Sequence, residues 1–109
     1  LDEISIFAKT EVIEINKKEL KKFTIEPRDF LEKNYEFKDI VGGDAEYNAS
    51  KIIELFEGKE SAFLEIVSLN SAAGLVVMNQ ETDLLSAYKK VKSHILDGSV
   101  MKKYKELKI

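Results

Sequence analysis

The 109-residue sequence has no cysteine and no tryptophan, and it contains only one proline and one histidine. Without cysteine, a disulfide framework and a thiolate metal site are both excluded. Charged residues make up 34% of the sequence. Together with the absence of cysteine, this composition indicates a reducing compartment, and we expect a cytoplasmic protein.

Long apolar runs are also missing. The longest strongly apolar stretch, residues 72–78, is far shorter than the roughly 20 residues that span a bilayer. Nothing near Leu1 has the order of basic, apolar and small residues that marks a signal peptide. Lysine and arginine number 17 against 20 aspartates and glutamates, and the two signs are interspersed. We therefore expect a protein that binds neither membranes nor nucleic acid.

The first part of the chain has a strand-like pattern. β-Branched residues roughly alternate with polar ones over residues 10–16 and again over residues 20–26, which predicts two strands. The polar residues 16–19 between them predict a tight turn, in which Asn16 tolerates a left-handed backbone. Because a lone hairpin is marginal in water, we expect it to pack on another element.

After Pro27, which ends the second predicted strand, residues 28–40 follow no period, and we expect a long connection with one short helical turn near Asp29. A helical pattern then begins beyond Gly43. Apolar residues recur every three or four positions in four segments. Their predicted first residues are Asp44, Ser61, Thr82 or Asp83, and Ser99.

The second helical segment has almost no polar face, so we expect it to be buried on most sides. Gly74 within it costs about 1 kcal/mol relative to alanine, which indicates a packing reason. Gly58 is placed to end the first helix, and Gly98 the third. The chain is expected to be one α+β domain, with a β-hairpin and connecting loop in residues 1–41 and about four helices in residues 42–109.

Few residues offer chemistry by themselves. His94 has no Cys, Ser or acidic partner at a fixed spacing, so we expect a surface or boundary residue without a catalytic role. The tyrosines at helical spacing, which are Tyr47, Tyr88 and Tyr104, are expected to be packing groups. Backbone amides at Gly42-Gly43-Asp44 could hold an anion at the start of a helix. Two glycines alone are a weak signal, however, and we favour a tight turn followed by a capping aspartate.

The sequence opens Leu1-Asp2-Glu3-Ile4-Ser5, with two adjacent carboxylates and no methionine before them. Carboxylate oxygens are ligands that Mg²⁺ takes one or two at a time, with water and substrate phosphate completing the shell. By composition alone, an acidic dipeptide at a chain end is far more often a solvated charge pair, and only its context could change that interpretation. These residues alone leave both interpretations open.

Several stretches carry a resemblance when they are taken in order. They are LDEIS at residues 1–5, GGDAEYNA at 42–49, SLNSAAGL at 68–75 and ILDGSVMKKYKELK at 95–108. Over essentially its whole length the chain resembles the C-terminal segment of the anthranilate phosphoribosyltransferase family. The resemblance implies the last part of an α/β domain of the phosphoribosyltransferase and nucleoside-phosphorylase type.

The family transfers the phosphoribosyl group of phosphoribosyl pyrophosphate to the amine of anthranilate in tryptophan biosynthesis, with Mg²⁺ on the pyrophosphate. Its members have a small helical N-terminal domain, which usually forms the homodimer, and a larger α/β domain. This chain resembles the tail of the larger domain only. The missing initiator methionine would then mark a cut, and we expect the isolated chain to be inactive.

By this resemblance Asp2 and Glu3 match the acidic pair that binds Mg²⁺. Five other residues match family motifs, and we interpret their role as structural, as a turn, a cap and buried hydrogen bonds: Gly42, Gly43, Asp44, Asn48 and Asn70. The glycine-rich phosphate loop and the anthranilate-binding residues have no counterpart here, so no catalytic residue is assigned. After Ser5 the family usually has a proline and a glycine, whereas this chain has Ile6-Phe7-Ala8-Lys9, which leaves the local backbone path open.

Two other interpretations of the sequence remain. The nearly all-apolar second helix would also suit a non-enzymatic helical module that associates with a partner or with itself. A nucleoside phosphorylase relative of similar fold would release different products. We expect the sequence that precedes Leu1 in the gene to separate these hypotheses.

Overall fold

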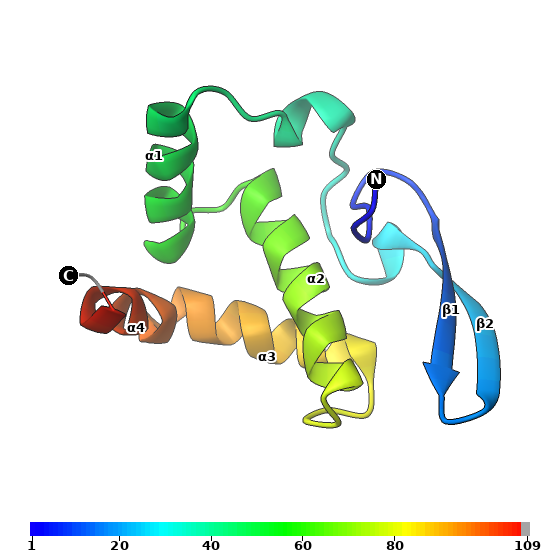
Figure 1. Cartoon of the computed structure of the whole chain (residues 1–109). Coiled ribbons are helices and arrows are strands. Elements are labelled where there is room, and N and C mark those ends of the chain that lie inside the picture. The colour runs from blue at the N-terminus through cyan, green and yellow to red at the C-terminus, as the bar shows by residue number, and fades with distance from the viewer. Residues whose placement is uncertain (108–109) are drawn as a thin grey trace.

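The computed structural model describes residues 1–107 and shows a β-hairpin beside four helices (Figure 1). The strands are β1 (Thr10–Asn16) and β2 (Glu19–Ile25), and the helices are α1 (Ala45–Phe56), α2 (Ala62–Val77), α3 (Leu84–Leu96) and α4 (Ser99–Leu107). The predicted α+β order, a hairpin followed by four helices, is confirmed. Residues 108–109, which end the predicted helical part, lie outside the described residues.

The hairpin is antiparallel, with Asn16 opposite Glu19 at its closed end. The left-handed residue of the turn is Lys17, whose φ is 56°. The expectation that Asn16 would take this conformation is wrong, because the loop is only two residues long and Asn16 still belongs to the strand ladder.

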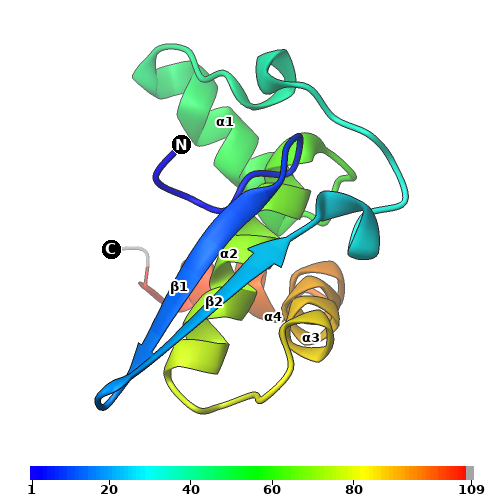
Figure 2. The same cartoon turned by 90° about the vertical axis from the view of Figure 1, so that its right-hand side faces the viewer.

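The side chains on the two faces of the hairpin differ in how far they are buried. On one face, near the open end, Ile25 is buried and Val12 and Phe23 are half-buried. On the other face, near the turn, Ile15 and Leu20 lie opposite each other and are each 72% exposed. Figure 2 shows the turn protruding from the body of the molecule. The hairpin therefore packs on the body at its base only.

The helices are started by side chains that accept backbone hydrogen bonds. Asp44, Ser61 and Asp83 accept from Tyr47 N–H at 2.8 Å, Leu64 N–H at 3.1 Å and Ser86 N–H at 2.9 Å. Asp83 is thus the cap of α3, and Thr82 is not. Gly58 and Gly98 follow α1 and α3 with φ of 80° and 88°, as their predicted role as terminating residues requires.

The connection between β2 and α1 contains two short 3-10 turns, Pro27–Asp29 and Phe37–Ile40. The first is the helical turn expected near Asp29. The second was not predicted. It is held by a reciprocal pair of hydrogen bonds in which the Glu36 side chain accepts from the Asp39 amide and the Asp39 side chain accepts from the Glu36 amide at 2.7 Å.

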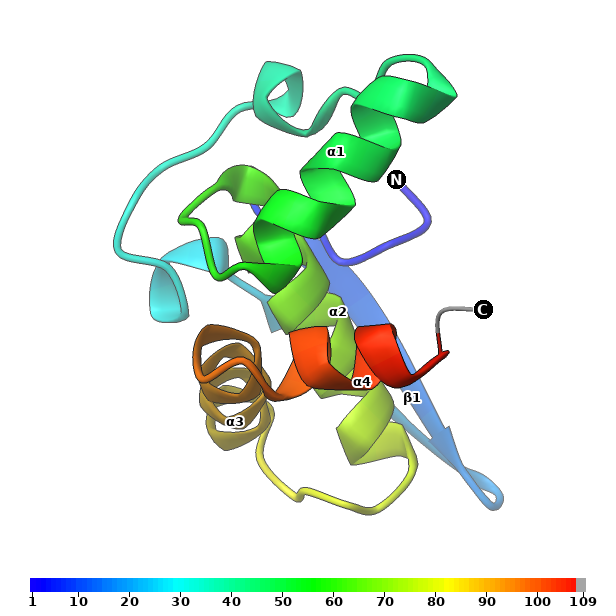
Figure 3. The same ribbon diagram turned by 90° about the vertical axis from the view of Figure 1, so that its left-hand side faces the viewer.

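The core lies where α2 crosses α3 and where the N-terminal segment reaches both. Its buried residues are Ile6, Leu31, Ala62, Leu69, Ala72, Ala87 and Tyr88. A second cluster joins α1, α2 and α3 through Leu55, Leu64 and Ile95. Figure 3 shows the side of the molecule where α1 and α4 lie nearest the viewer. Ile6 thus joins the N-terminal segment to the main core.

The expectation that α2 is buried on most sides is confirmed, because 12 of its 16 residues are buried or half-buried, but one face is exposed. Val67, Ser71, Gly74 and Val77 recur at helical spacing along one exposed face, and Val77 is 80% exposed. A Cβ atom at Gly74 would meet nothing within 4 Å, so the described residues supply no packing reason for this glycine. None of the helices within residues 1–107 combines the length and the apolar character that a membrane-spanning helix needs.

Candidate functional site

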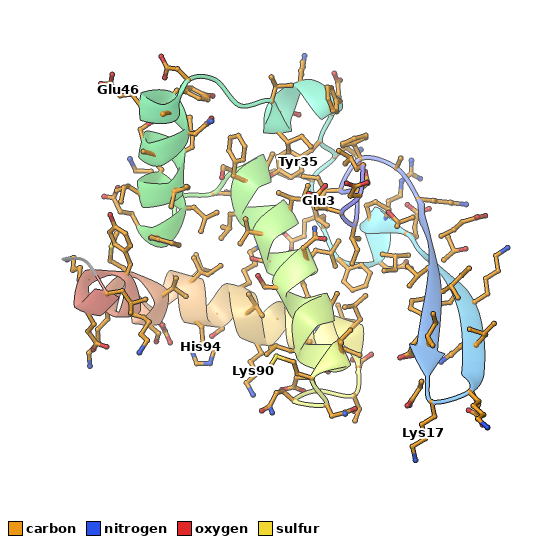
Figure 4. All side chains as sticks on the ribbon, viewed as in Figure 1. Glu3, Lys17, Tyr35, Glu46, Lys90 and His94 are labelled. Carbon is orange, nitrogen blue, oxygen red and sulfur yellow. The ribbon has the colours of Figure 1, made fainter. Side chains whose placement is uncertain are left out.

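Asp2 and Glu3 are exposed at the start of the chain. Figure 4 shows Glu3 on the N-terminal segment, on the side of α2 that faces the hairpin. Within residues 1–107, neither carboxylate forms a salt bridge with a basic side chain. Both side chains therefore keep their oxygens available to a ligand from solution.

The residue that follows the acidic pair is held on α2 by Asn70. The Ile4 N–H donates to Asn70 Oδ1 at 2.8 Å, and Asn70 Nδ2 donates to the Ile4 carbonyl at 3.0 Å. Asn70 Nδ2 also donates to the carbonyl of Ile66 on its own helix at 2.9 Å. The Asn70 side chain of the SLNSAAGL stretch thus forms two hydrogen bonds with the backbone of the LDEIS stretch.

The chain after Ile4 is fixed by Ser5. The Ser5 Oγ accepts from the N–H groups of Phe7 and Ala8, each at 3.1 Å, and the Ser5 N–H donates to Thr10 Oγ1 at 3.0 Å. Ile6 is 2% exposed in the main core. No residue from 6 to 9 has a positive φ, so this turn does not need the glycine that the family usually has there.

A shallow hollow of about 510 Å³ lies beside Glu3. Its polar lining includes Glu3, Lys9 and Glu11, and Phe7 and Phe37 meet edge to face beside it at 5.8 Å between ring centroids. Asp2 does not line this hollow. The structure therefore places the two adjacent carboxylates differently, one at the hollow and one outside it.

The acidic pair fits an open magnesium site better than a closed one. No group of three or more His, Cys, Asp or Glu side chains that could hold a metal occurs in the part of the chain that the structure describes. Mg²⁺ is usually bound by one or two carboxylates, several waters and substrate phosphates. Two exposed carboxylates beside a fixed backbone match this donor set, which the substrate would complete.

The GGD turn is built by a second asparagine. The Gly43 N–H donates to Asn48 Oδ1 at 2.9 Å, and Asn48 Nδ2 donates to the Gly43 carbonyl at 3.1 Å. A Cβ atom at Gly42 would lie 2.8 Å from Asn48 Oδ1, so the close approach favours glycine. Since Asn48 occupies the Gly43 amide and Asp44 occupies that of Tyr47, this geometry favours a turn and a cap over an anion site.

The residues expected to be inert lie mostly as predicted. His94 is exposed on α3 (Figure 4). Tyr88 is buried, and the Tyr104 ring packs on Phe56 at 5.3 Å between centroids. Tyr47 is the exception, because it is exposed.

A buried polar cluster was not predicted. Glu65 on α2 is 4% exposed, and its two carboxylate oxygens accept from the Tyr88 hydroxyl and, at 2.6 Å, from Lys92 Nζ. Burial and the hydrogen bond to Glu65 raise the pKa of Tyr88 well above its usual range. The three side chains line a cavity of about 580 Å³, together with the ion pair of Lys33 and Glu60. The spacing of Tyr88 and Lys92, four residues apart on one helix face, was the available sequence signal.

Comparison with known proteins agrees with the order of the motifs. The family described as "Glycosyl transferase family, a/b domain" matches residues 1–101. Proteins named anthranilate phosphoribosyltransferase are 35% identical in Pelagibacter ubique, 36% in Clostridium kluyveri and 34% in Petrotoga mobilis, each over 107 residues. These alignments cover 98% of this chain but only 31–32% of each relative.

The chain thus spans about a third of the length of the curated relatives it matches. The match with the family extends from the acidic pair at the start to Met101 in α4. It includes Asn48 and Asn70, whose side chains each form hydrogen bonds with a backbone outside their own helix. The chain therefore belongs to the glycosyl transferase family, through its a/b domain.

Proposed function

We propose that the chain is the C-terminal part of an anthranilate phosphoribosyltransferase, an enzyme of tryptophan biosynthesis whose substrates are phosphoribosyl pyrophosphate and anthranilate. The names of the relatives that align with 98% of the chain support this assignment. The observation that carries it is the exposed acidic pair on a backbone held by Asn70. The cysteine-free composition supports a cytoplasmic location.

The proposed reaction is a substitution at C1 of the ribose. A bond forms from C1 to the anthranilate nitrogen, while the bond from C1 to the pyrophosphate oxygen breaks. The pyrophosphate leaves with the bonding electron pair, and the amine loses one proton. Negative charge therefore increases on the leaving group, and C1 gains oxocarbenium character.

Asp2 and Glu3 would hold the Mg²⁺ that this departure needs. The ion, when bound, neutralises the charge that develops on the pyrophosphate. The chain's own contribution is to present two oxygen ligands from a backbone that Asn70 and Ser5 hold in place. No closed cage of side chains is required, because water and the substrate phosphates complete the shell.

We propose that the 109-residue chain alone is inactive and that the complete enzyme is a homodimer formed through an N-terminal domain. The sequence has no glycine-rich phosphate loop. The exposed apolar residues of the hairpin and of α2 support a segment that belongs to a larger fold, notably Ile15, Leu20 and Val77.

The test is an assay of the protein encoded by the complete reading frame. We expect it to form phosphoribosyl anthranilate and pyrophosphate in the presence of Mg²⁺. Titration of the 109-residue chain with Mg²⁺ and phosphoribosyl pyrophosphate should show no binding tighter than millimolar. A complete protein that instead cleaves nucleosides with phosphate, or micromolar binding by the short chain, would contradict the proposal.

A second candidate is a non-enzymatic module that associates through its helices. The observation that favours it is the exposed, uncharged face of α2, with Val67, Ser71, Gly74 and Val77. Light scattering of the 109-residue chain separates the two proposals. A strict monomer that binds no hydrophobic dye would argue against the module, whereas a stable dimer without transferase activity in the complete protein would favour it.

A further inference from the structure

Asn70 makes a hydrogen bond with every polar group of its side chain. Oδ1 accepts from the Ile4 N–H, and Nδ2 donates to two carbonyls, those of Ile4 and Ile66. A carboxamide has two N–H donors, so this arrangement uses both of them. The bond to Ile66 fixes the side chain on its own helix. The two bonds to Ile4 then hold the backbone of a residue that lies 66 positions earlier in the sequence.

The position of this contact matters because Ile4 directly follows Glu3. Both backbone polar groups of Ile4 are held, as they would be in a strand ladder. The next residues are held as well, by the Ser5 hydroxyl and by the burial of Ile6. The carboxylates of Asp2 and Glu3 therefore stand two residues and one residue, respectively, before a fixed part of the backbone.

Exposed carboxylates on an unattached chain end would lose backbone entropy on binding a metal ion. A backbone that is already fixed loses less, which favours binding. Groups that orient metal ligands without touching the metal typically change metal affinity or activity by 10–100-fold when removed. Asn70 lies one step further out than such a group, since it contacts the backbone beside the carboxylates and not the carboxylates themselves, so its effect belongs at the lower end of this range.

We infer that Asn70 is a positioning residue for the metal pair, and that it sets the affinity of Asp2 and Glu3 for a divalent cation on the substrate pyrophosphate. This inference rests on the proposed function. It goes beyond a purely structural role for Asn70, in which its loss would lower the stability of the fold and leave cation affinity unchanged.

Asn48 supplies a matched control. It holds Gly43 with the same pair of reciprocal hydrogen bonds, from the Gly43 N–H to Oδ1 and from Nδ2 to the Gly43 carbonyl. Asn70→Ala and Asn48→Ala therefore both remove a reciprocal pair of hydrogen bonds to a backbone, in one case beside the acidic pair and in the other beside the start of α1, and Asn70→Ala also removes the bond to the Ile66 carbonyl. A loss of cation affinity in Asn70→Ala alone would show that a backbone clamp beside the acidic pair matters for the cation, whereas one beside α1 does not.

The experiment uses the protein from the complete reading frame with Mn²⁺ in place of Mg²⁺. The signal of unbound Mn²⁺ in electron paramagnetic resonance gives its affinity in the presence of phosphoribosyl pyrophosphate. For Asn70→Ala we expect an affinity about 10-fold weaker, and a kcat that returns to the wild-type value at saturating Mn²⁺. For Asn48→Ala we expect an affinity within about twofold of the wild type, because other outer groups remain in place.

A second variant keeps the test informative if Asn70→Ala does not fold. Asn70→Ser adds no charge and keeps one short hydroxyl, which cannot replace the bonds to both the Ile4 N–H and the carbonyls of Ile4 and Ile66. We expect it to weaken Mn²⁺ affinity as well, and to speed hydrogen exchange at the Ile4 amide. Exchange at the Gly43 amide should stay unchanged.

The outcomes separate this inference from the proposed function. If the wild-type protein forms phosphoribosyl anthranilate but the Asn70 variants bind Mn²⁺ as tightly as the wild type, the positioning role is wrong and the proposed function stands. If the wild-type protein binds no Mn²⁺ with phosphoribosyl pyrophosphate and makes no product, both are wrong.

Discussion

Glu65 is a buried carboxylate whose two oxygens each have a donor, Tyr88 on one and Lys92 on the other. This cluster joins the first turn of α2 to α3 through polar side chains within an otherwise apolar contact. A buried acceptor that loses its donor costs more free energy than the hydrogen bond contributed to stability. We therefore expect the removal of any member of the cluster to lower the free energy of unfolding.

Tyr88→Phe tests this sensitivity. The substitution keeps the ring but removes the hydroxyl, so one oxygen of Glu65 is left without its donor. We expect the free energy of unfolding to fall by about 2 kcal/mol, measured by urea denaturation. The control is Tyr104→Phe, which changes a half-buried ring on α4 and should have little effect. Equal losses in the two variants would show that the hydroxyl of Tyr88 has no special role.

The same tyrosine makes stability depend on pH. Burial and the hydrogen bond to Glu65 raise the pKa of Tyr88 above its ordinary value of 10.0. Above pH 10 the unfolded chain therefore releases a proton that the folded chain still holds. Since the unfolded state binds fewer protons there, the free energy of unfolding falls as pH rises, by at most about 1.4 kcal/mol per pH unit for this group.

We expect the difference in stability between the wild type and Tyr88→Phe to be constant below pH 9 and to shrink above pH 10. Tyr35, whose pKa burial also raises, is present in both proteins and drops out of the comparison. Denaturation series at several pH values measure this difference. A difference in stability that grows above pH 10 would contradict a pKa of Tyr88 that folding raises.

Local signals in the sequence predicted most of the elements. The capping residues and the glycines that end helices act on their nearest neighbours, so the starts at Asp44 and Ser61 were predictable without tertiary information. The Phe37–Ile40 turn was missed because its capping pair, Glu36 and Asp39, lies outside any apolar period. Lys17 was missed because propensity favours asparagine in a left-handed turn, whereas the length of the loop decided the position.

Which face of α2 stays exposed could not be predicted from its own sequence. A helix that is apolar all round gives no sign of which face meets the rest of the chain. The structure turns Leu69 and Ala72 inward and leaves Val67 and Val77 exposed. That choice depends on where α3 and the N-terminal segment pack, which no local period contains.

Ser61→Ala tests the start of α2. Ser61 Oγ accepts from the Leu64 N–H at 3.1 Å, and alanine cannot replace that bond. We expect a loss of about 1 kcal/mol in the free energy of unfolding, measured by thermal or urea denaturation. Ser71→Ala, in the exposed middle of the same helix, is the control and should be neutral or slightly stabilising. The cap has no energetic role if both serines respond alike.

The whole molecule brings together stretches that lie far apart in the sequence. The family motifs LDEIS and SLNSAAGL meet through Ile4 and Asn70, and that contact joins the acidic pair to the main core. Their order in the sequence predicted a relationship to the family, but it did not predict that a side chain of one motif would form hydrogen bonds with the backbone of the other. Such a contact depends on chain topology, which residue spacing alone does not determine.

The exposed apolar surfaces also belong to the molecule as a whole. Ile15 and Leu20 on the hairpin and Val77 on α2 lie on surfaces that no described element covers. The chain spans about a third of the length of its relatives, so these surfaces are consistent with the proposed position in a longer enzyme. The acidic pair would then need substrate groups held by other parts of that enzyme.

The most direct test of the account is the Mg²⁺ dependence of phosphoribosyl anthranilate formation by the complete protein carrying Asp2→Asn and Glu3→Gln together. Both changes keep the shape of the side chains and remove their charge. We predict a rate roughly 100-fold or more below the wild type at limiting Mg²⁺. Glu14→Gln, an exposed carboxylate on β1, should keep the wild-type rate. A double variant with the wild-type rate and an unchanged Mg²⁺ requirement would contradict the account.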